Sequence, residues 1–342
     1  MINSQKHENS DNIFPKALHT PLCDLLGIEF PIFQAGMGYV AFGTLAGEVS
    51  KEGGLGVIGA AYMSPETLCR EISKARSITD KPFAVDILFG LPKSDGSETQ
   101  TYTKEVEDHI RVVLEENVPI VVSGLGNPSG FIKQAHDQGI IVMSVVGNTK
   151  QAKRLEAEGV DVIIASGYEG GGHTGRVGTS VVVPSIVDNV KLPVIAAGGL
   201  VDGRGLVAAL SFGAQGVWMG TRFVATQEAS VHLNYKEKIT QINDEGTVVT
   251  RAHSGKPCRL IKNNFTQQWD EKQDEILPFP TQLLQVGKPA SDKGRMEGNV
   301  ENGSCPAGQG AANIAEIKKA GQVVRDIIDE ASHVLERLTA GL

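Results

Sequence analysis

Short runs of apolar and β-branched residues recur along the first two thirds of the chain, and each is followed by a segment with helical spacing. Eight such runs stand in order: residues 31–35 (PIFQA), 55–60 (LGVIGA), 83–88 (FAVDIL), 119–123 (PIVVS), 140–146 (IIVMSVV), 160–165 (VDVIIA), 192–197 (LPVIAA) and 214–219 (AQGVWM). Because the runs are nearly continuous in apolar residues, both faces of each strand are expected to be covered. Eight such units predict an α/β fold, a (β/α)8 TIM barrel.

The segments between the runs support this prediction. Residues 64–77 open with Ser64, which can cap a helix, and Pro65, which suits the first helical position. Residues 149–158 and 203–212 are similar short amphipathic stretches. Residues 313–338 repeat apolar positions at helical spacing, and we expect a C-terminal helix that packs back on the barrel.

The pattern breaks after the eighth run. Residues 227–310 are polar and poor in β-branched runs, and residues 287–303 are expected to be a loop or disordered. We therefore predict a small, mainly helical domain inserted after the last strand. The expected division is a barrel over residues 1–226, the inserted domain over 227–310 and the C-terminal helix within 311–342.

Composition narrows the class of protein. The formal charge is 32 − 40 = −8, so there is no basic surplus for nucleic acid or an anionic membrane surface. The hydrophobic share of 41%, without an apolar run of 18 residues, indicates an ordinary core and no transmembrane helix. Glycine is abundant, with 40 of 342 residues, and such residues are useful where backbone turns sharply or approaches a ligand.

Cysteine usage and the N-terminus point to the cytoplasm. The four cysteines, Cys23, Cys69, Cys258 and Cys305, form no C-x-x-C pair, so we expect reduced thiols and no metal site. Residues 1–11 are polar and lack the apolar stretch of a secretory signal.

Small and polar residues follow nearly every predicted strand, at the barrel end where catalytic loops gather. The ends carry Gln34-Ala35-Gly36-Met37-Gly38 after the first run, Asp86 within the third, Ser123-Gly124 after the fourth, Ser166 through Gly175 after the sixth, Gly198-Gly199 after the seventh and Gly220-Thr221-Arg222 after the eighth. The last two ends commonly form the phosphate site of a barrel enzyme. Exposed N–H groups, a hydroxyl and Arg222 there would suit a phosphorylated cofactor, although the glycines could also serve only to make tight turns.

His173 is the leading catalytic candidate. It lies in the loop Gly170–Gly175, and its imidazole can take or give a proton near neutral pH. The other histidines have no comparable setting, and His253 is among those interpreted as surface or packing residues. Asp86 and Glu169 lie at different strand ends, so a carboxylate pair has little support, and Glu169 could instead be solvated or paired with Arg176. Neither a P-loop nor a Rossmann G-x-G-x-x-G pattern is present.

Four segments resemble nitronate monooxygenases, formerly called 2-nitropropane dioxygenases. They are FPIFQAGMGYVAFGTLAGEVSKEGGLGVIG, GVDVIIASGYEGGGHTGRVGT, LPVIAAGGLVDGRGLVAALSFGAQGVWMGTRFVAT and NGSCPAGQG. The resemblance spans residues 22–331 and is shared with flavin-dependent enoyl-acyl carrier protein reductases. It implies a (β/α)8 barrel with a smaller inserted domain and non-covalent FMN at the strand ends.

The resemblance also implies roles for individual residues. Gln34, Gly36 and Met37 would lie near the flavin ring, whereas Gly198, Gly199, Gly220 and Thr221 would hold the phosphate, and Gln309 would return toward the flavin. His173 matches the base of nitroalkane oxidation. From their strand-end positions we add Asp86, Ser123, Gly171 and Gly172 as cofactor-binding candidates. Two positions depart from the family: Ser166 replaces a frequent Gln or Glu, and Gly36 replaces the proline of the common Q-A-P-M form.

The implied function is FMN-dependent oxidation of nitronates and nitroalkanes by O2 to a carbonyl compound and nitrite. The alternative is an NAD(P)H-dependent flavin reductase acting on an enoyl thioester or a quinone. The glycine form of the first strand end also occurs among the enoyl reductases, whereas TVVTRAHSGKPCRLIKNNFT resembles the monooxygenase branch. A non-catalytic flavin-binding protein is a third reading. Expected partners are a small-molecule substrate and O2, and a homodimer is compatible with the sequence.

Overall fold

The computed structural model describes residues 16–90 and 102–340 of the chain. The predicted polar N-terminal stretch, with His7, lies outside the described residues. Within them, no helix combines the length and apolar character needed to cross a bilayer, and all four cysteines are free.

Eight parallel strands form the barrel, which confirms the predicted fold class. They are β1 (Ile32–Gln34), β2 (Val57–Gly59), β3 (Ala84–Leu88), β4 (Ile120–Leu125), β5 (Ile141–Val146), β6 (Val162–Ser166), β8 (Val194–Ala197) and β9 (Val217–Met219). Their order around the sheet is β1-β9-β8-β6-β5-β4-β3-β2. A parallel bridge between Phe33 and Leu55 joins β1 to β2 and brings the two edges together. Each strand falls within or beside a predicted run.

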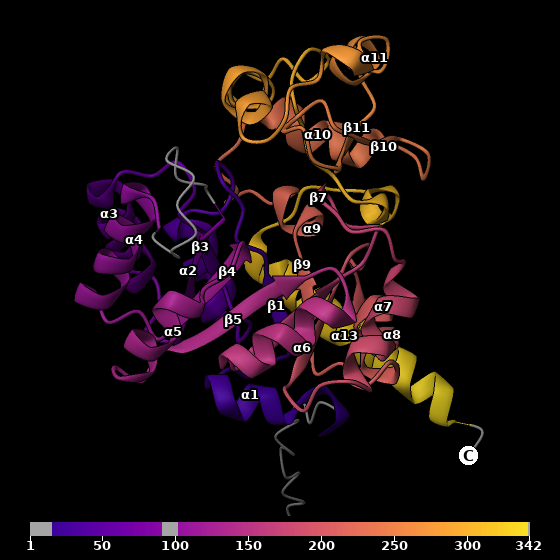
Figure 1. Ribbon diagram of the computed structural model, residues 1–342. Coiled ribbons are helices and arrows are strands. Elements are labelled where there is room, and N and C mark those ends of the chain that lie inside the picture. The colour runs from indigo at the N-terminus through magenta and orange to yellow at the C-terminus, as the bar shows by residue number, and fades with distance from the viewer. Residues whose placement is uncertain (1–15, 91–101, 341–342) are drawn as a thin grey trace, which may run out of the picture.

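Helices alternate with the strands around the outside (Figure 1). They are α2 (Gly43–Lys51), α3 (Pro65–Arg76), α4 (Lys104–Glu115), α5 (Ser129–His136), α6 (Thr149–Glu158), α7 (Thr179–Val187), α8 (Gly203–Ser211) and the short α9 (Thr221–Val224). Ser64 caps α3 as predicted, since its side chain accepts a hydrogen bond from the Thr67 N–H. The 3-10 helix η1 (Lys16–Leu18) and helix α1 (Pro21–Leu26) precede the barrel.

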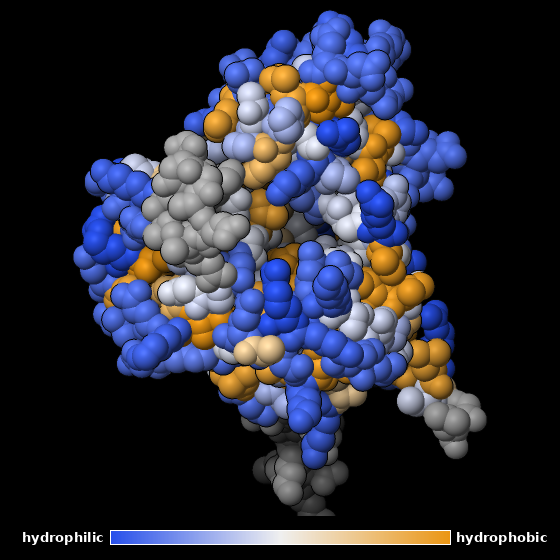
Figure 2. Space-filling model, in the orientation of Figure 1, coloured by the Kyte–Doolittle hydropathy of each residue, from blue (hydrophilic) through white to orange (hydrophobic). Residues whose placement is uncertain are grey.

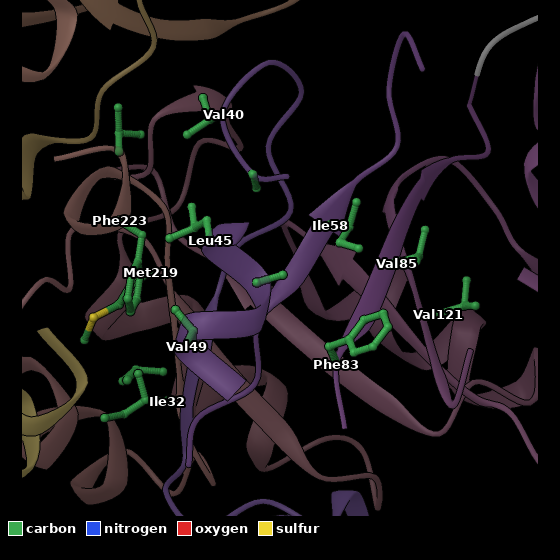
Figure 3. Packing of buried hydrophobic residues seen from close by; sticks show 14 of the residues in the cluster. Ile32, Val40, Leu45, Val49, Ile58, Phe83, Val85, Val121, Met219 and Phe223 are labelled. Atoms are coloured by element: carbon green, nitrogen blue, oxygen red, sulfur yellow. The ribbon is translucent and has the colours of Figure 1, made fainter. Parts of the chain in front are cut away.

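Two apolar layers support the barrel, because alternate strand residues point inward and outward. Inward residues such as Val57, Ile120 and Ile164 pack with Leu22 and Leu26 of α1, which belongs to the same interior cluster. Outward residues pack against the helices. Figure 3 shows part of this outer layer, in which Leu45 and Val49 of α2 lie near Ile32 and Met219. Both strand faces are therefore buried, as the continuous apolar runs indicated.

The inserted segment, residues 227–310, contains helices and also a hairpin that the sequence did not predict. Its helices are α10 (Leu233–Gln241), α11 (Asn264–Asp270), the 3-10 helix η2 (Gln273–Glu275), the π-helices η3 (Leu283–Gly287) and η4 (Asp292–Met296), and α12 (Lys288–Ser291). Strands β10 (Thr247–Thr250) and β11 (Cys258–Ile261) are antiparallel, and β11 also pairs with β7 (Gly172–His173) from the barrel. The segment thus holds the loop that carries His173.

The expectation of a loop or disorder over residues 287–303 is wrong for residues 287–296, whereas residues 297–303 form turns and bends outside any helix or strand. Continuous helical turns run from Leu283 to Met296. Two hydrogen bonds tie these turns to the following chain: the Ser304 N–H donates to the Ala290 carbonyl, and Arg295 Nε donates to the Ser304 carbonyl. Packing between these distant turns overrides a local composition typical of loops.

The C-terminal helix α13 (Ala320–Thr339) begins later than predicted. The 3-10 helix η5 (Gln309–Asn313) precedes it, and Lys318 forms a parallel bridge with Thr226 instead of entering the helix. The Glu228 carboxylate accepts a hydrogen bond from the Ala320 N–H at the start of α13. The helix then packs against α8 and α2 (Figure 1).

Candidate active site

A cavity of about 300 Å³ lies between the carboxyl ends of the strands and the inserted segment. Figure 2 shows the surface hollowed between these two parts. The inserted segment contributes Tyr235, His253, Cys258, Phe279, Leu283, Arg295, Pro306, Gly308 and Gly310 to the lining. We use the name cavity floor for the lining residues at the carboxyl ends of the barrel strands, which include Gly36, Met37, Asp86, Ser166, Gly198, Gly199, Gly220 and Thr221. The volume is in the range of small-molecule and cofactor sites.

Most residues predicted from the sequence lie together around this cavity. The lining contains Gly36, Met37, Asp86, Gly171, Gly172, His173, Gly198, Gly199, Gly220 and Thr221. Ser166, noted as a departure from the family, also lines it.

Three predicted cofactor residues lie outside the lining. Gln34 is fully buried and forms hydrogen bonds to both backbone groups of Val57, which link β1 to β2. Ser123 is also fully buried, on β4 next to the inward-facing Val122. The Gln309 side chain is exposed, while its N–H donates to the Glu169 carbonyl. Gln34 and Ser123 therefore contribute to strand pairing and packing, and Gln309 contacts the loop after β6 through its backbone.

The end of β8 provides a backbone cradle in the floor. Gly198 and Gly199 have φ angles of +107° and +75°, a conformation that side chains disfavour. A Cβ atom at Gly198 would lie 2.9 Å from Thr179 Oγ1, so the position has no room for one. Neither N–H group donates a hydrogen bond to any described residue. Free N–H groups facing a cavity are suited to an anion such as phosphate.

Two side chains near this cradle do not act as the sequence suggested. The predicted contribution of Arg222 is wrong: its Nη2 donates to the carbonyls of Ala225 and Glu316, away from the cavity. Burial lowers the pKa of Arg222 to about 10. Glu169 is half-buried and forms no ion pair with Arg176; its carboxylate accepts hydrogen bonds of 2.8 and 2.7 Å from the Thr179 N–H and hydroxyl.

Thr221 connects the floor to the inserted segment. Its hydroxyl accepts a hydrogen bond of 2.9 Å from the Gly308 N–H. Gly308 belongs to the chain that returns from the inserted segment, and both residues line the cavity. This contact closes the cavity on the side of β9.

Asp86 places a buried carboxyl group in the floor, and its side chain is 6% exposed. Burial raises its pKa to about 8, although Oδ1 accepts a hydrogen bond of 2.8 Å from the Gly124 N–H. The group is therefore mostly protonated at neutral pH. A Cβ atom at Gly36 would lie 2.3 Å from the Asp86 Cβ, so Asp86 explains why glycine stands here in place of proline.

His173 lies on β7, where pairing with Cys258 of β11 fixes its backbone. Its Nε2 forms a hydrogen bond of 2.7 Å with Ser254 Oγ, and its Nδ1 has no hydrogen-bond partner among the described residues. The side chain is accessible from the cavity, yet surrounding protein removes much of its solvation. This desolvation, with the charges of Lys256 and Arg295, lowers the pKa of His173 to about 4. The imidazole is neutral at pH 7 and able to accept a proton.

His253 was not identified as a site residue by sequence reasoning, and of the two expected roles, surface or packing, the structure contradicts the surface one. It is buried, lines the cavity and has its ring centroid 6.0 Å from that of His173. Its Nδ1 is 2.9 Å from Ser304 Oγ. Burial, with Arg295 and His173 nearby, holds its pKa well below the usual value. The hairpin that carries it was not predicted, so no strand end drew attention to it.

Comparisons with known proteins agree with this architecture. The family model for nitronate monooxygenase matches residues 19–330. A relative from Mycobacterium tuberculosis, (3aS,4S,5R,7aS)-5-hydroxy-7a-methyl-1-oxo-octahydro-1H-indene-4-carboxyl-CoA dehydrogenase, is 37% identical over 79% of this chain and 74% of its own. The structure of FabK from Thermotoga maritima is 40% identical, covers 95% of this chain and 99% of its own, and has a TM-score of 0.86.

A second solved structure is nitroalkane oxidase from Streptomyces ansochromogenes. It is 27% identical, covers 93% of this chain and 99% of its own, and has a TM-score of 0.83. The family model spans nearly the whole barrel and the inserted segment. The chain belongs to the nitronate monooxygenase family of flavin-dependent oxidoreductases.

Proposed function

We propose that the protein binds FMN and oxidises nitronates and nitroalkanes with O2 to a carbonyl compound and nitrite. The observation that carries the proposal is His173, a cavity-lining imidazole that is neutral at pH 7 and whose Nδ1 has no hydrogen-bond partner among the described residues. The family match and the likeness to a nitroalkane oxidase support the same reaction. We also propose a cytoplasmic location, with which the free cysteines are compatible.

The floor fits a phosphorylated flavin. Gly198 and Gly199 offer free N–H groups where a Cβ atom would intrude, and Gly220 and Thr221 complete the edge proposed for the phosphate. Gly36, Met37 and the protonated Asp86 would lie along the ring, and Gly171 and Gly172 would border it. When bound, the flavin would supply the redox chemistry, exchanging electrons with the nitronate and O2.

The side chains of His173 and Ser254 would carry out the proton transfer from the substrate. Ser254 holds His173 through Nε2, which leaves Nδ1 to remove the α-proton of a neutral nitroalkane. The charge left on the substrate spreads over the two nitro oxygens. A preformed nitronate has already lost this proton, so it needs no base.

The His173→Asn variant tests the proposal. Turnover of a neutral nitroalkane is expected to fall by about 10²–10⁴-fold, the usual cost of losing a positioned base. Turnover of the matching nitronate should fall much less, with unchanged FMN content as the control. Equal losses on both substrates would assign His173 to substrate binding, and unchanged nitroalkane turnover would remove it from the mechanism.

A second candidate is NAD(P)H-dependent reduction of an enoyl thioester. The observation in its favour is the relative named as a carboxyl-CoA dehydrogenase, which is 37% identical. That reaction needs a proton donor to the substrate carbon, and His173 would have to be protonated first, which its pKa of about 4 disfavours at neutral pH. Parallel assays with a nitronate and with NADH or NADPH separate the two candidates.

A further inference from the structure

One buried arginine differs from the others in how its guanidinium is used. Arg222, Arg259 and Arg295 are all less than a tenth exposed. Arg222 Nη2 donates to two carbonyls, and Arg259 Nη1 and Nη2 donate to Thr247 Oγ1 and the Tyr168 carbonyl. Arg295 donates only through Nε, to the Ser304 carbonyl 3.0 Å away. Its two terminal nitrogens have no acceptor among the residues that the structure describes.

Arg295 also differs in position, because it alone of the three lines the cavity. It lies on η4, and its guanidinium carbon is 5.5 Å from the centroid of the Tyr39 ring. No carboxylate lies within ion-pair distance of it in the described chain. Asp86 is the one carboxyl group in the lining, and it is mostly protonated at neutral pH. The cavity therefore holds a buried guanidinium that forms no ion pair with any described carboxylate.

An isolated buried charge is costly, on the order of several kcal/mol, unless something pairs with it. A guanidinium presents parallel N–H groups that match two oxygens of one planar group. The partner that fits is therefore an anion with such a pair of oxygens.

We propose that Arg295 is a substrate-binding residue that pairs with the two oxygens of a planar anionic group, the nitronate in the reaction proposed above. This inference rests on the proposed function for the identity of the anion. As His173 removes a proton from a nitroalkane, negative charge grows on the same two oxygens, and a fixed guanidinium would stabilise it. The negative charge that develops on these oxygens would also offset the charge of Arg295 felt by His173 as the imidazole takes up the proton.

The inference can be tested by binding alone. Isobutyrate matches propane 2-nitronate in heavy-atom connectivity, charge and its planar pair of oxygens, but it cannot reduce a flavin, and isobutyramide is its neutral counterpart. In the FMN-loaded protein, titrations followed by the flavin spectrum and by calorimetry should show isobutyrate bound at least about tenfold more tightly than isobutyramide. The Arg295→Met variant should lose this preference, and Arg295→Lys should keep part of it.

Lys288→Met is the matched control. Lys288 is exposed, and its Nζ lies 5.3 Å from the ring centroid of Tyr62, another lining residue. The substitution removes one positive charge close to the cavity without touching Arg295. The preference for isobutyrate should be unchanged. This result would distinguish a direct ion pair between Arg295 and the anion from a nonspecific effect of positive charge near the cavity.

Three results would overturn the inference. An undiminished preference in Arg295→Met would show that the guanidinium does not hold the anion. A loss of FMN affinity without loss of riboflavin affinity would assign Arg295 to the cofactor phosphate. If Arg295→Met fails to fold, full anion preference in a folded Arg295→Gln would be equally decisive. A protein that binds isobutyrate through Arg295 but does not oxidise nitronates would refute the proposed reaction alone.

Discussion

The cavity has two sides that are built in different ways. Glycine is the commonest residue of the floor, so backbone is exposed to the cavity at the ends of several neighbouring strands, and the one buried carboxyl there, Asp86, is held by a backbone N–H. The inserted segment instead contributes long polar side chains, His253 and Arg295, from a hairpin and a π-helix. A floor of backbone suits a fixed cofactor, whereas side chains above it can be exchanged to suit a substrate. The comparison indicates that cofactor binding and substrate choice can be altered separately.

The largest expected effect is on the floor. Gly199→Asp places a carboxylate where a phosphate is proposed, and repulsion in a partly desolvated site costs on the order of several kcal/mol. FMN affinity should fall by about 10³-fold or more, measured by equilibrium dialysis. Because Gly199 has a φ of +75°, Gly199→Ala is the control that carries the same backbone strain without the charge. Equal losses in both variants would mean that strain, not a phosphate, explains the result.

A smaller effect should come from the carboxyl group in the floor. The folded pKa of Asp86, about 8, lies above its unfolded value near 3.9, so the folded protein keeps a proton that the unfolded chain releases. Between these values the free energy of unfolding should fall by about 1.4 kcal/mol for each pH unit of increase. Urea unfolding of the flavin-free protein at pH 6, 7 and 8 measures this slope. Asp86→Asn should flatten it, and an unchanged slope would show that Asp86 is ionised in the folded state.

The smallest effect concerns the contact between the two sides. Thr221→Val removes the acceptor of the Gly308 N–H and should lower the stability of the flavin-free protein by about 1–2 kcal/mol. Thr221→Ser keeps the hydroxyl and should cost less. Equal stability of wild type and Thr221→Val would mean that the returning chain is held by its other contacts.

The difference between the two sides also explains which parts of the fold and of the site could be predicted from the sequence. The eight strands could be predicted because a buried parallel strand leaves a continuous apolar run. The cavity floor could be predicted too, because the carboxyl ends of parallel strands lie at the same end of a barrel. Gly36, Gly199 and His173 line one cavity there, as expected.

The cavity residues of the inserted segment could not be predicted in this way. His253 and Arg295 reach the cavity through contacts between residues distant in sequence, such as those of each side chain with Ser304. Local composition indicated a loop over residues 287–303, although residues 287–296 form helical turns. Contacts with residues distant in the sequence cannot be inferred from local composition. Arg222 shows the same limit in the barrel: its place beside Thr221 was clear, but the direction of its side chain depended on carbonyls at Ala225 and Glu316.

The central claim is that a nitronate, held between the two sides, is the reductant of the bound flavin. The most direct test is to mix the FMN-loaded protein with propane 2-nitronate without oxygen, and separately with NADH and with NADPH, while the flavin absorbance is recorded. We predict rapid loss of the oxidised flavin band with the nitronate and none with either nicotinamide. Rapid loss with NADH or NADPH, and none with the nitronate, would contradict the claim and favour the enoyl thioester reductase.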